Sequence, residues 1–139
     1  MFPKFAKSRF QEEFLSLTER VGHHPVTPFE RRVLPLAFGG RDLAVEVPRG
    51  EDITAAMVLA GLPAARERSG ENVSVVLTSN PDSVRKIGQQ LRLVAARWDK
   101  SAYTVSIGLD ENIKKELQLL SRPPDIIVGT PERLIDHIR

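Results

Sequence analysis

The chain has 139 residues, of which 41% are hydrophobic and 27% charged, a composition typical of one globular domain. The absence of cysteine excludes a disulfide framework and a cysteine-bound metal, and it favours a reducing compartment. No apolar run reaches membrane-span length, the first residues lack the apolar core of a signal peptide, and the net charge of +2 alone does not argue for nucleic acid. We therefore expect a cytoplasmic protein without a membrane partner.

Two helices are expected in the first third of the chain. Residues 8–21 carry apolar side chains at steps of four, three and four, which is one face of a helix. Two prolines in residues 23–28 push the residues before them out of the helical region. Thr27 is then placed to cap a second helix, with Pro28 in its first turn and its end near Phe38.

Residues 42–56 have the layout of a phosphate-binding loop. An apolar strand at residues 43–47 runs into a turn at Gly50, and a helix at residues 54–62 follows, stopped by Gly61 and Pro63. A working loop reads G-x-x-x-x-G-K-[ST], in which backbone N–H groups surround phosphate, the lysine reaches it and the hydroxyl holds magnesium.

The residues that give such a loop its chemistry are missing here. Gly50 and Thr54 stand at the central glycine and the hydroxyl, but Asp52 takes the second glycine position, Ile53 takes the lysine position, and Glu51 precedes them. We interpret the two carboxylates as caps of the following helix. A divalent-cation site would lack oxygen ligands, so no metal or cofactor is expected.

The rest of the chain alternates strands with helices. The strands are short apolar runs, which is typical of strands buried on both faces of a parallel sheet. This order predicts a doubly wound α/β fold, in which ligands bind at the carboxyl ends of the strands. The expected elements are strands at residues 73–78, 103–107 and 125–128, a helix capped by Asn80 with Val84, Ile87, Leu91, Val94 and Trp98 inward, a helix at residues 111–121 with Ile113, Leu117 and Leu120 inward, and a last helix at residues 131–139 capped by Thr130.

In this order the segments resemble the first RecA-like domain of DEAD-box RNA helicases. The matching segments are GHHPVTPFE (the Q motif) with Phe5 upstream, LPLAFGGRDL, VPRGEDIT for A-x-T-G-S-G-K-T, VVLTSNPDSVRKIGQQL for P-T-R-E-L-A, SIGLDENIKKELQLL for the GG segment and PDIIVGTPERLIDHI for T-P-G-R. The resemblance covers residues 1–139, with residues 1–30 as a Q-motif-like extension. It implies an incomplete domain, because the D-E-A-D segment, the S-A-T segment and the second domain of active members are not present.

The resemblance implies a degenerate nucleotide site. It would comprise Phe5, His23 in place of the family's adenine-stacking aromatic, Glu30 in place of the adenine-reading glutamine, and the loop Gly50, Glu51, Asp52, Ile53 and Thr54. A carboxylate at position 30 can accept a hydrogen bond from adenine N6, but it has no donor for N7 and its lone pairs repel that atom. Each loop carboxylate at about 5 Å from a phosphate charge costs roughly 3 kcal/mol at an effective dielectric of about 20.

Of the family's RNA-contacting segments, the one that matches T-P-G-R is better kept than the other two. The T-P-G-R match retains Thr130, Pro131 and Arg133, with Glu132 in place of glycine, and the GG pair survives as Gly108 and Leu109. In the P-T-R-E-L-A match the arginine has become Pro81. A cap with a surface arginine is an equally good interpretation of the T-P-G-R match.

These departures predict a catalytically inactive helicase-like domain rather than an enzyme. The first hypothesis is a protein-interaction or assembly module that binds a protein partner or itself. The alternative is a weak, ATP-independent RNA-binding module that uses Arg133, Thr130 and the basic pairs at residues 31–32, 85–86 and 114–115. A third is part of a longer helicase-like protein with residual nucleotide binding. An exposed apolar patch would favour the first, and a continuous basic strip at the strand ends would favour the second.

Overall fold

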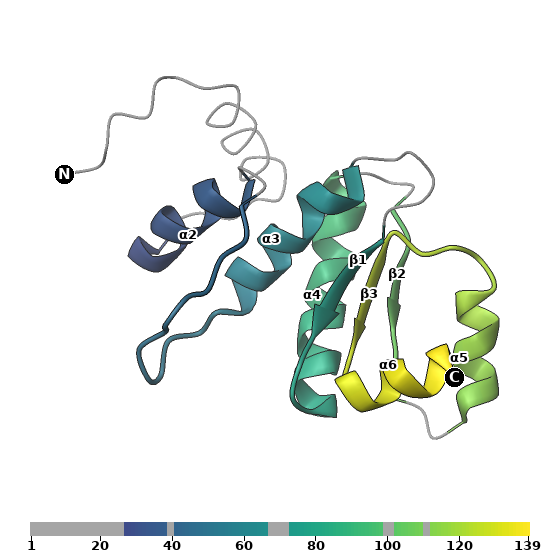
Figure 1. Ribbon diagram of the computed structural model, residues 1–139. Coiled ribbons are helices and arrows are strands. Elements are labelled where there is room, and N and C mark those ends of the chain that lie inside the picture. Colours follow the sequence, from purple (N-terminus) through teal and green to yellow (C-terminus); the bar gives the residue numbers. More distant parts are fainter. Residues whose placement is uncertain (1–26, 39–40, 67–72, 99–101, 110–111) are drawn as a thin grey trace.

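The computed structural model describes residues 27–38, 41–66, 73–98, 102–109 and 112–139 (Figure 1). The expected helix at residues 8–21 and most of the Q-motif-like extension therefore lie outside the described residues. The elements in chain order are α2 (Pro28–Phe38), α3 (Thr54–Arg66), β1 (Ser74–Leu77), α4 (Pro81–Trp98), β2 (Thr104–Ser106), α5 (Ile113–Leu120), β3 (Ile126–Gly129) and α6 (Pro131–Ile138).

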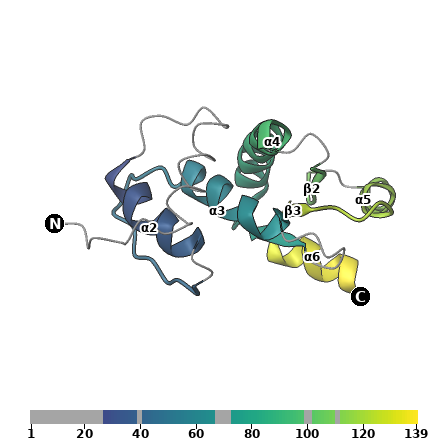
Figure 2. The ribbon, with the colours of Figure 1, turned by 90° about the horizontal axis from the view of Figure 1, so that it is seen from above.

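The three strands form one parallel sheet in the order β1-β3-β2. In its register Val75 lies opposite Ile127, and Val105 lies opposite the same residue from the other side. Helices connect the strands, and in the view from above α4 and α6 lie on opposite sides of the sheet (Figure 2). The expected α/β fold with a parallel sheet and helices on both faces is confirmed.

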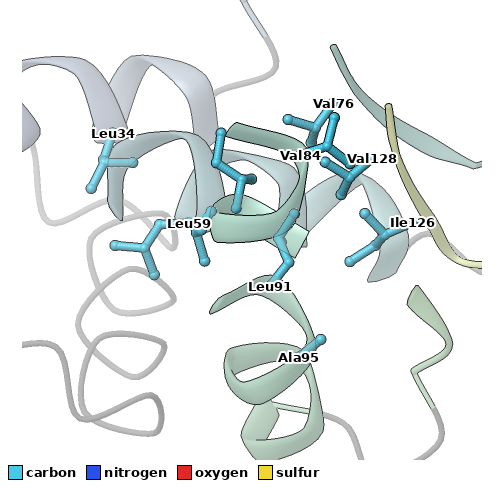
Figure 3. Packing of buried hydrophobic residues seen from close by; sticks show 10 residues of the cluster. Leu34, Leu59, Val76, Val84, Leu91, Ala95, Ile126 and Val128 are labelled. Carbon is cyan, nitrogen blue, oxygen red and sulfur yellow. The ribbon is translucent and has the colours of Figure 1, made fainter. Parts of the chain in front are cut away.

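The hydrophobic core lies between one face of the sheet and α3 and α4. Val76, Ile126 and Val128 share that face through the register and are at most 8% exposed. Four of the α4 residues expected to point inward belong to this core: Val84 and Leu91 are completely buried, Ile87 is 5% exposed, and Val94 packs against the cluster (Figure 3). The side chain of the fifth, Trp98, lies outside the described residues. Burying such side chains is worth about 2 kcal/mol each, so this face holds the sheet and the two helices together.

The opposite face of the sheet is covered unevenly. Val105 on β2 is 2% exposed, whereas Val75 and Leu77 on β1 are each 47% exposed. The outer edge of β1 meets no strand in the described part of the chain, because β1 pairs with β3 alone. An open strand edge that carries large apolar side chains is therefore part of the described surface.

The strand expected at residues 43–47 is not formed, and this expectation was wrong. The segment has no ladder partner among the residues that the structure describes, Leu43 is 40% exposed and Val45 is 45% exposed. In Figure 1 it runs on the side of α3 away from the sheet. High strand propensity does not make a strand by itself, since a strand needs a neighbour for its N–H and C=O groups.

The helix after the loop is longer than expected. α3 continues to Arg66 through Gly61 and Pro63, where the sequence predicted its end. Proline removes one backbone hydrogen bond, but its fixed φ is compatible with a helix, and packing of α3 against α2, α4 and β1 offsets the loss. Gly61 and Pro63, which ordinarily end a helix, are thus tolerated inside α3 because of its tertiary packing.

Candidate functional site

The first candidate site is the loop before α3. Gly50 adopts φ +84°, a left-handed conformation that favours glycine, and the N–H of Glu51 donates to the carbonyl of Pro48 at 3.2 Å. A Cβ at Gly50 would meet no atom of the described residues within 4 Å. The turn therefore requires glycine for its backbone angle and not for close approach of another group.

Asp52 closes this loop with its own carboxylate. Its Oδ1 accepts from the backbone N–H of Thr54 at 2.9 Å, and its Oδ2 pairs with Lys86 of α4 at 3.3 Å. These bonds, first those to Thr54 and then that to Lys86, lower the pKa of Asp52 from 3.8 to about 2. The capping role expected for Asp52 is confirmed, and the donor that phosphate would use at this helix start is already occupied.

The neighbours of Asp52 do not rebuild a phosphate site. Ile53, at the lysine position, is half-buried, as expected for an inward side chain, and Thr54 is 8% exposed. Glu51 and Arg49 are exposed. The structure thus brings the five residues from Gly50 to Thr54 together as a self-capped turn with two carboxylates.

Glu30 lies in a capping box at the start of α2. Its N–H donates to Thr27 Oγ1 at 3.2 Å, and its Oε2 accepts from the Thr27 N–H at 3.0 Å. The residue is only 2% exposed. The sequence signal was present in Thr27-Pro28-Phe29-Glu30, which has the T-x-x-E spacing of this motif. The other two members of the expected adenine site, Phe5 and His23, lie outside the described residues.

The second candidate site lies at the carboxyl ends of β2 and β3. Gly108 adopts φ +89°, and a Cβ there would lie 3.5 Å from Arg133 Cβ and 3.9 Å from Thr130 Oγ1. Thr130 caps α6 by accepting from the Arg133 N–H at 3.4 Å. Pro131 is exposed in the first turn of that helix. The four residues expected to contact RNA are therefore neighbours in space.

Glu116 of α5, which the sequence analysis did not single out, is the centre of this cluster. Its Oε1 accepts from the Gly108 N–H at 2.7 Å, and its Oε2 accepts from Arg133 Nε at 2.9 Å. His137 Nε2 lies 2.6 Å from the same Oε2. Burial raises the pKa of Glu116, but hydrogen bonds from His137, Arg133 and Gly108 outweigh it and hold that pKa below its ordinary value.

The inward face expected for α5 was wrong at Leu117, while Ile113 and Leu120, its other two members, are half-buried. Leu117 is 52% exposed, while Glu116 beside it is 2% exposed. A hydrophobic pattern could not show this, because the buried position is a carboxylate whose cost of burial is offset by three donors. The available signal was the i, i+4 spacing of Arg133 and His137, which places two donors on one face of α6.

The basic pairs are spread over three helices of the described part of the chain, α2, α4 and α5. All six side chains are exposed. Arg85 pairs with Asp82 at 3.2 Å, and Lys86 pairs with Asp52. Among the described residues there is also no group of three metal-ligating side chains and no helix long and apolar enough to cross a membrane.

Comparison with known proteins points to one family. The model of the DEAD/DEAH box helicase family matches residues 27–139. An ATP-dependent RNA helicase CshA of Listeria monocytogenes is 24% identical over 97% of this chain and 26% of its own length. An ATP-dependent rRNA helicase rrp3 of Aspergillus terreus is 32% identical over 86% of this chain and 26% of its own length.

A solved structure gives the same result. The RNA helicase Prp28 of Chaetomium thermophilum, bound to ADP, superposes with a TM-score of 0.72 at 29% identity, covering 91% of this chain and 32% of that one. The present chain thus spans about a quarter of the length of the curated relatives and a third of this structural one.

Proposed function

Because the chain belongs to the DEAD/DEAH box helicase family, we propose that it is a helicase-like module that has kept the RecA-like fold without ATP hydrolysis and serves in protein interaction or assembly. Residues 1–139 form one unit in this proposal, with residues 1–30 as its extension. The lack of cysteine supports a reducing, cytoplasmic setting.

The loop before α3 supports the loss of ATP turnover. A nucleotide would have to displace the bond from Thr54 to Asp52 and then face the Asp52 and Glu51 carboxylates without a lysine at position 53. Isothermal calorimetry with ATP and magnesium should show no binding below millimolar concentration. Saturable micromolar binding would contradict the proposal. The variant Glu51→Ser/Asp52→Gly/Ile53→Lys should regain part of the phosphate affinity without hydrolysis.

The open edge of β1 is the observation that carries the interaction role. The Ser74 N–H donates to the carbonyl of Asp125, just before β3, and the Thr78 N–H donates to that of Gly129 in β3, so the N–H groups of Val75 and Leu77, the alternate residues, point away from the sheet. Val75 and Leu77 of β1 are each 47% exposed, and Val73, just before the strand, is 43% exposed. An edge of this kind is a ready template for an added strand from another chain.

Charge substitution on this edge tests the interaction role. Sedimentation equilibrium of the wild-type chain should show concentration-dependent self-association, and Val75→Glu should weaken it because the charge would be desolvated in a strand pair. Leu93→Glu, on α4 at 62% exposure, is the matched control and should leave association unchanged. An edge variant that associates as the wild type does would argue against β1 as the contact.

RNA binding is the second candidate, favoured by the meeting of Gly108, Thr130 and Arg133 at the strand ends. The two curated relatives described above are named as RNA helicases, and their RNA contacts would be kept here in weak, ATP-independent form. Binding should then rest on phosphate contacts and fall steeply with salt. Arg133→Ala should weaken binding to all RNA sequences alike, whereas strongly sequence-selective binding would contradict this candidate.

A third candidate follows from length. Since the relatives are about four times longer, the chain is also consistent with part of a longer helicase-like protein in which residual nucleotide binding depends on segments outside these residues.

A further inference from the structure

Glu116 joins three parts of the second candidate site that are distant in the sequence. Its two carboxylate oxygens accept from the turn after β2, through the Gly108 N–H, and from α6, through Arg133 and His137. The side chain is 2% exposed, so RNA cannot reach it directly. Any effect of Glu116 on RNA binding must therefore act through the residues that it holds.

The bonds to Glu116 determine where the Arg133 guanidinium lies. The Arg133 side chain is 19% exposed, and its stem packs against Gly108, where a Cβ would lie 3.5 Å away. Arg133 cannot swing outward without leaving a buried carboxylate short of a donor, which is strongly unfavourable. Glu116 therefore holds the guanidinium in the cluster that it forms with the Gly108 turn and His137.

His137 limits the movement of the carboxylate itself. Its side chain is 4% exposed, its Nε2 lies 2.6 Å from Oε2, and its Nδ1 is buried without a hydrogen-bond partner in the described part of the chain. The contact between Nε2 and Glu116 thus orients the His137 ring. With donors on both sides, Oε2 cannot turn to follow a displaced Arg133.

We propose that Glu116 is a positioning residue that holds Arg133 and the Gly108 turn in the geometry that contacts an RNA phosphate beside Thr130. This inference rests on the RNA-binding candidate function described above. It makes the contact pre-organised, so the entropy of ordering a long arginine side chain is lost on folding rather than on binding.

The direction in which one substitution changes the RNA affinity distinguishes positioning by Glu116 from a simple effect of its charge. Glu116→Gln removes a negative charge near the proposed phosphate, so electrostatics alone would raise RNA affinity. It also places an amide N–H or a weaker acceptor against Arg133 and His137, which disturbs the guanidinium. Loss of one charge-assisted hydrogen bond to phosphate corresponds to about a tenfold fall in affinity, and we expect this fall to prevail.

Fluorescence anisotropy with a short labelled oligo-uridine RNA at low salt measures the effect. Glu132→Gln is the matched control, since it removes the same charge from the exposed first turn of α6. We expect Glu132→Gln to raise affinity slightly, and Glu116→Gln to lower it about as much as Arg133→Ala does. The double variant Glu116→Gln/Arg133→Ala should be no weaker than Arg133→Ala alone, because both changes remove one contact.

The outcomes are distinct. Affinity that rises in Glu116→Gln as in Glu132→Gln would overturn positioning while leaving RNA binding intact. A wild-type chain that does not bind the RNA would overturn the RNA-binding candidate and this inference with it. If thermal melting shows that Glu116→Gln does not fold, Arg133→Lys decides: lysine keeps the charge but lacks the planar fork, so positioning predicts about a tenfold loss, and unchanged affinity would refute it.

Discussion

Asp52 accepts a hydrogen bond from a backbone N–H at the start of α3. In other proteins, the N–H groups at such a helix start bind phosphate. Its Oδ1 takes the Thr54 N–H, and Lys86 compensates its charge from α4. The bonds are local and need no ligand, which accounts for an ordered turn around Gly50 whose lysine position holds Ile53. At the scale of single residues, a carboxylate of the chain thus accepts from a donor of the kind that a bound phosphate would use.

The stability that Asp52 provides should depend on pH. Its folded-state pKa of about 2 lies below the ordinary 3.8, so its contribution is full above pH 3.8 and is lost as pH falls toward 2. Asp52→Ala should lower the free energy of unfolding by about 1 kcal/mol at neutral pH, as for other caps. Urea unfolding of both proteins measures this difference, which should shrink in acid.

Glu51→Ala is the control for this prediction, because Glu51 is the adjacent exposed carboxylate of the same turn. It should change stability by less than Asp52→Ala at every pH. Equal stability of wild type and Asp52→Ala at neutral pH would show that the turn does not depend on its cap.

At the scale of elements, local signals predicted where helices begin better than which face they bury. Thr27, Asn80 and Thr130 cap α2, α4 and α6 as expected, because capping bonds join residues two or three apart in the sequence. The inner face of α5 was not predictable in this way. Its buried residue is Glu116, whose donors lie between 8 and 21 residues away.

The packing of α4 on the sheet gives a prediction at this scale. Gly88 lies inside α4, where alanine would ordinarily stabilise a helix by up to about 1 kcal/mol. A Cβ at this position would overlap Ser106 Oγ on β2 and lie 3.3 Å from Ser106 Cβ. Gly88→Ala should therefore destabilise the domain by about 1–3 kcal/mol, measured by thermal or urea unfolding.

Ser106→Ala provides the rescue for Gly88→Ala. It removes the overlapping hydroxyl, so the double variant should recover most of the loss. Alanine at the exposed Gln89, the next position of α4, should be nearly neutral. A stabilising Gly88→Ala would mean that α4 and β2 separate at little cost.

At the scale of the whole molecule, the fold class followed from the alternation of strands and helices, but strand pairing did not. The segments at residues 73–78 and 125–128 are close to the observed β1 and β3, whereas residues 43–47 lie outside the sheet. All three segments are alike in composition. Which of them pair could not be predicted, because pairing depends on contacts distant in sequence. The family resemblance is confirmed across residues 27–139, but neither it nor the strand pattern indicated the role of Glu116.

Glu116 also links α5, the Gly108 turn and α6, whose side chains are not part of the main core cluster. The core cluster comprises side chains of α2, α3, α4, β1 and β3. The cohesion of the other half of the molecule therefore depends on a buried carboxylate as well as on the apolar contacts of Val105 and Ile107. It should be more sensitive to acid than the apolar core.

The acid sensitivity of the whole domain tests this division. The pKa of Glu116 is lowered in the folded state from the ordinary 4.5, so its stabilisation is complete above pH 4.5 and is lost as pH falls through the lower, folded-state value. Glu116→Gln should destabilise the domain at neutral pH by about 3 kcal/mol, because it breaks a largely buried ion pair with Arg133. The stability of this variant should depend less on pH in that acid range. Glu132→Gln, exposed on α6, should retain the wild-type acid transition.

Amide exchange should place the first acid-induced opening at Gly108 and α6, ahead of α4. If α4 and α6 instead exchange together at every pH, the two halves unfold as one unit, and the stabilisation by Glu116 is shared across the whole sheet.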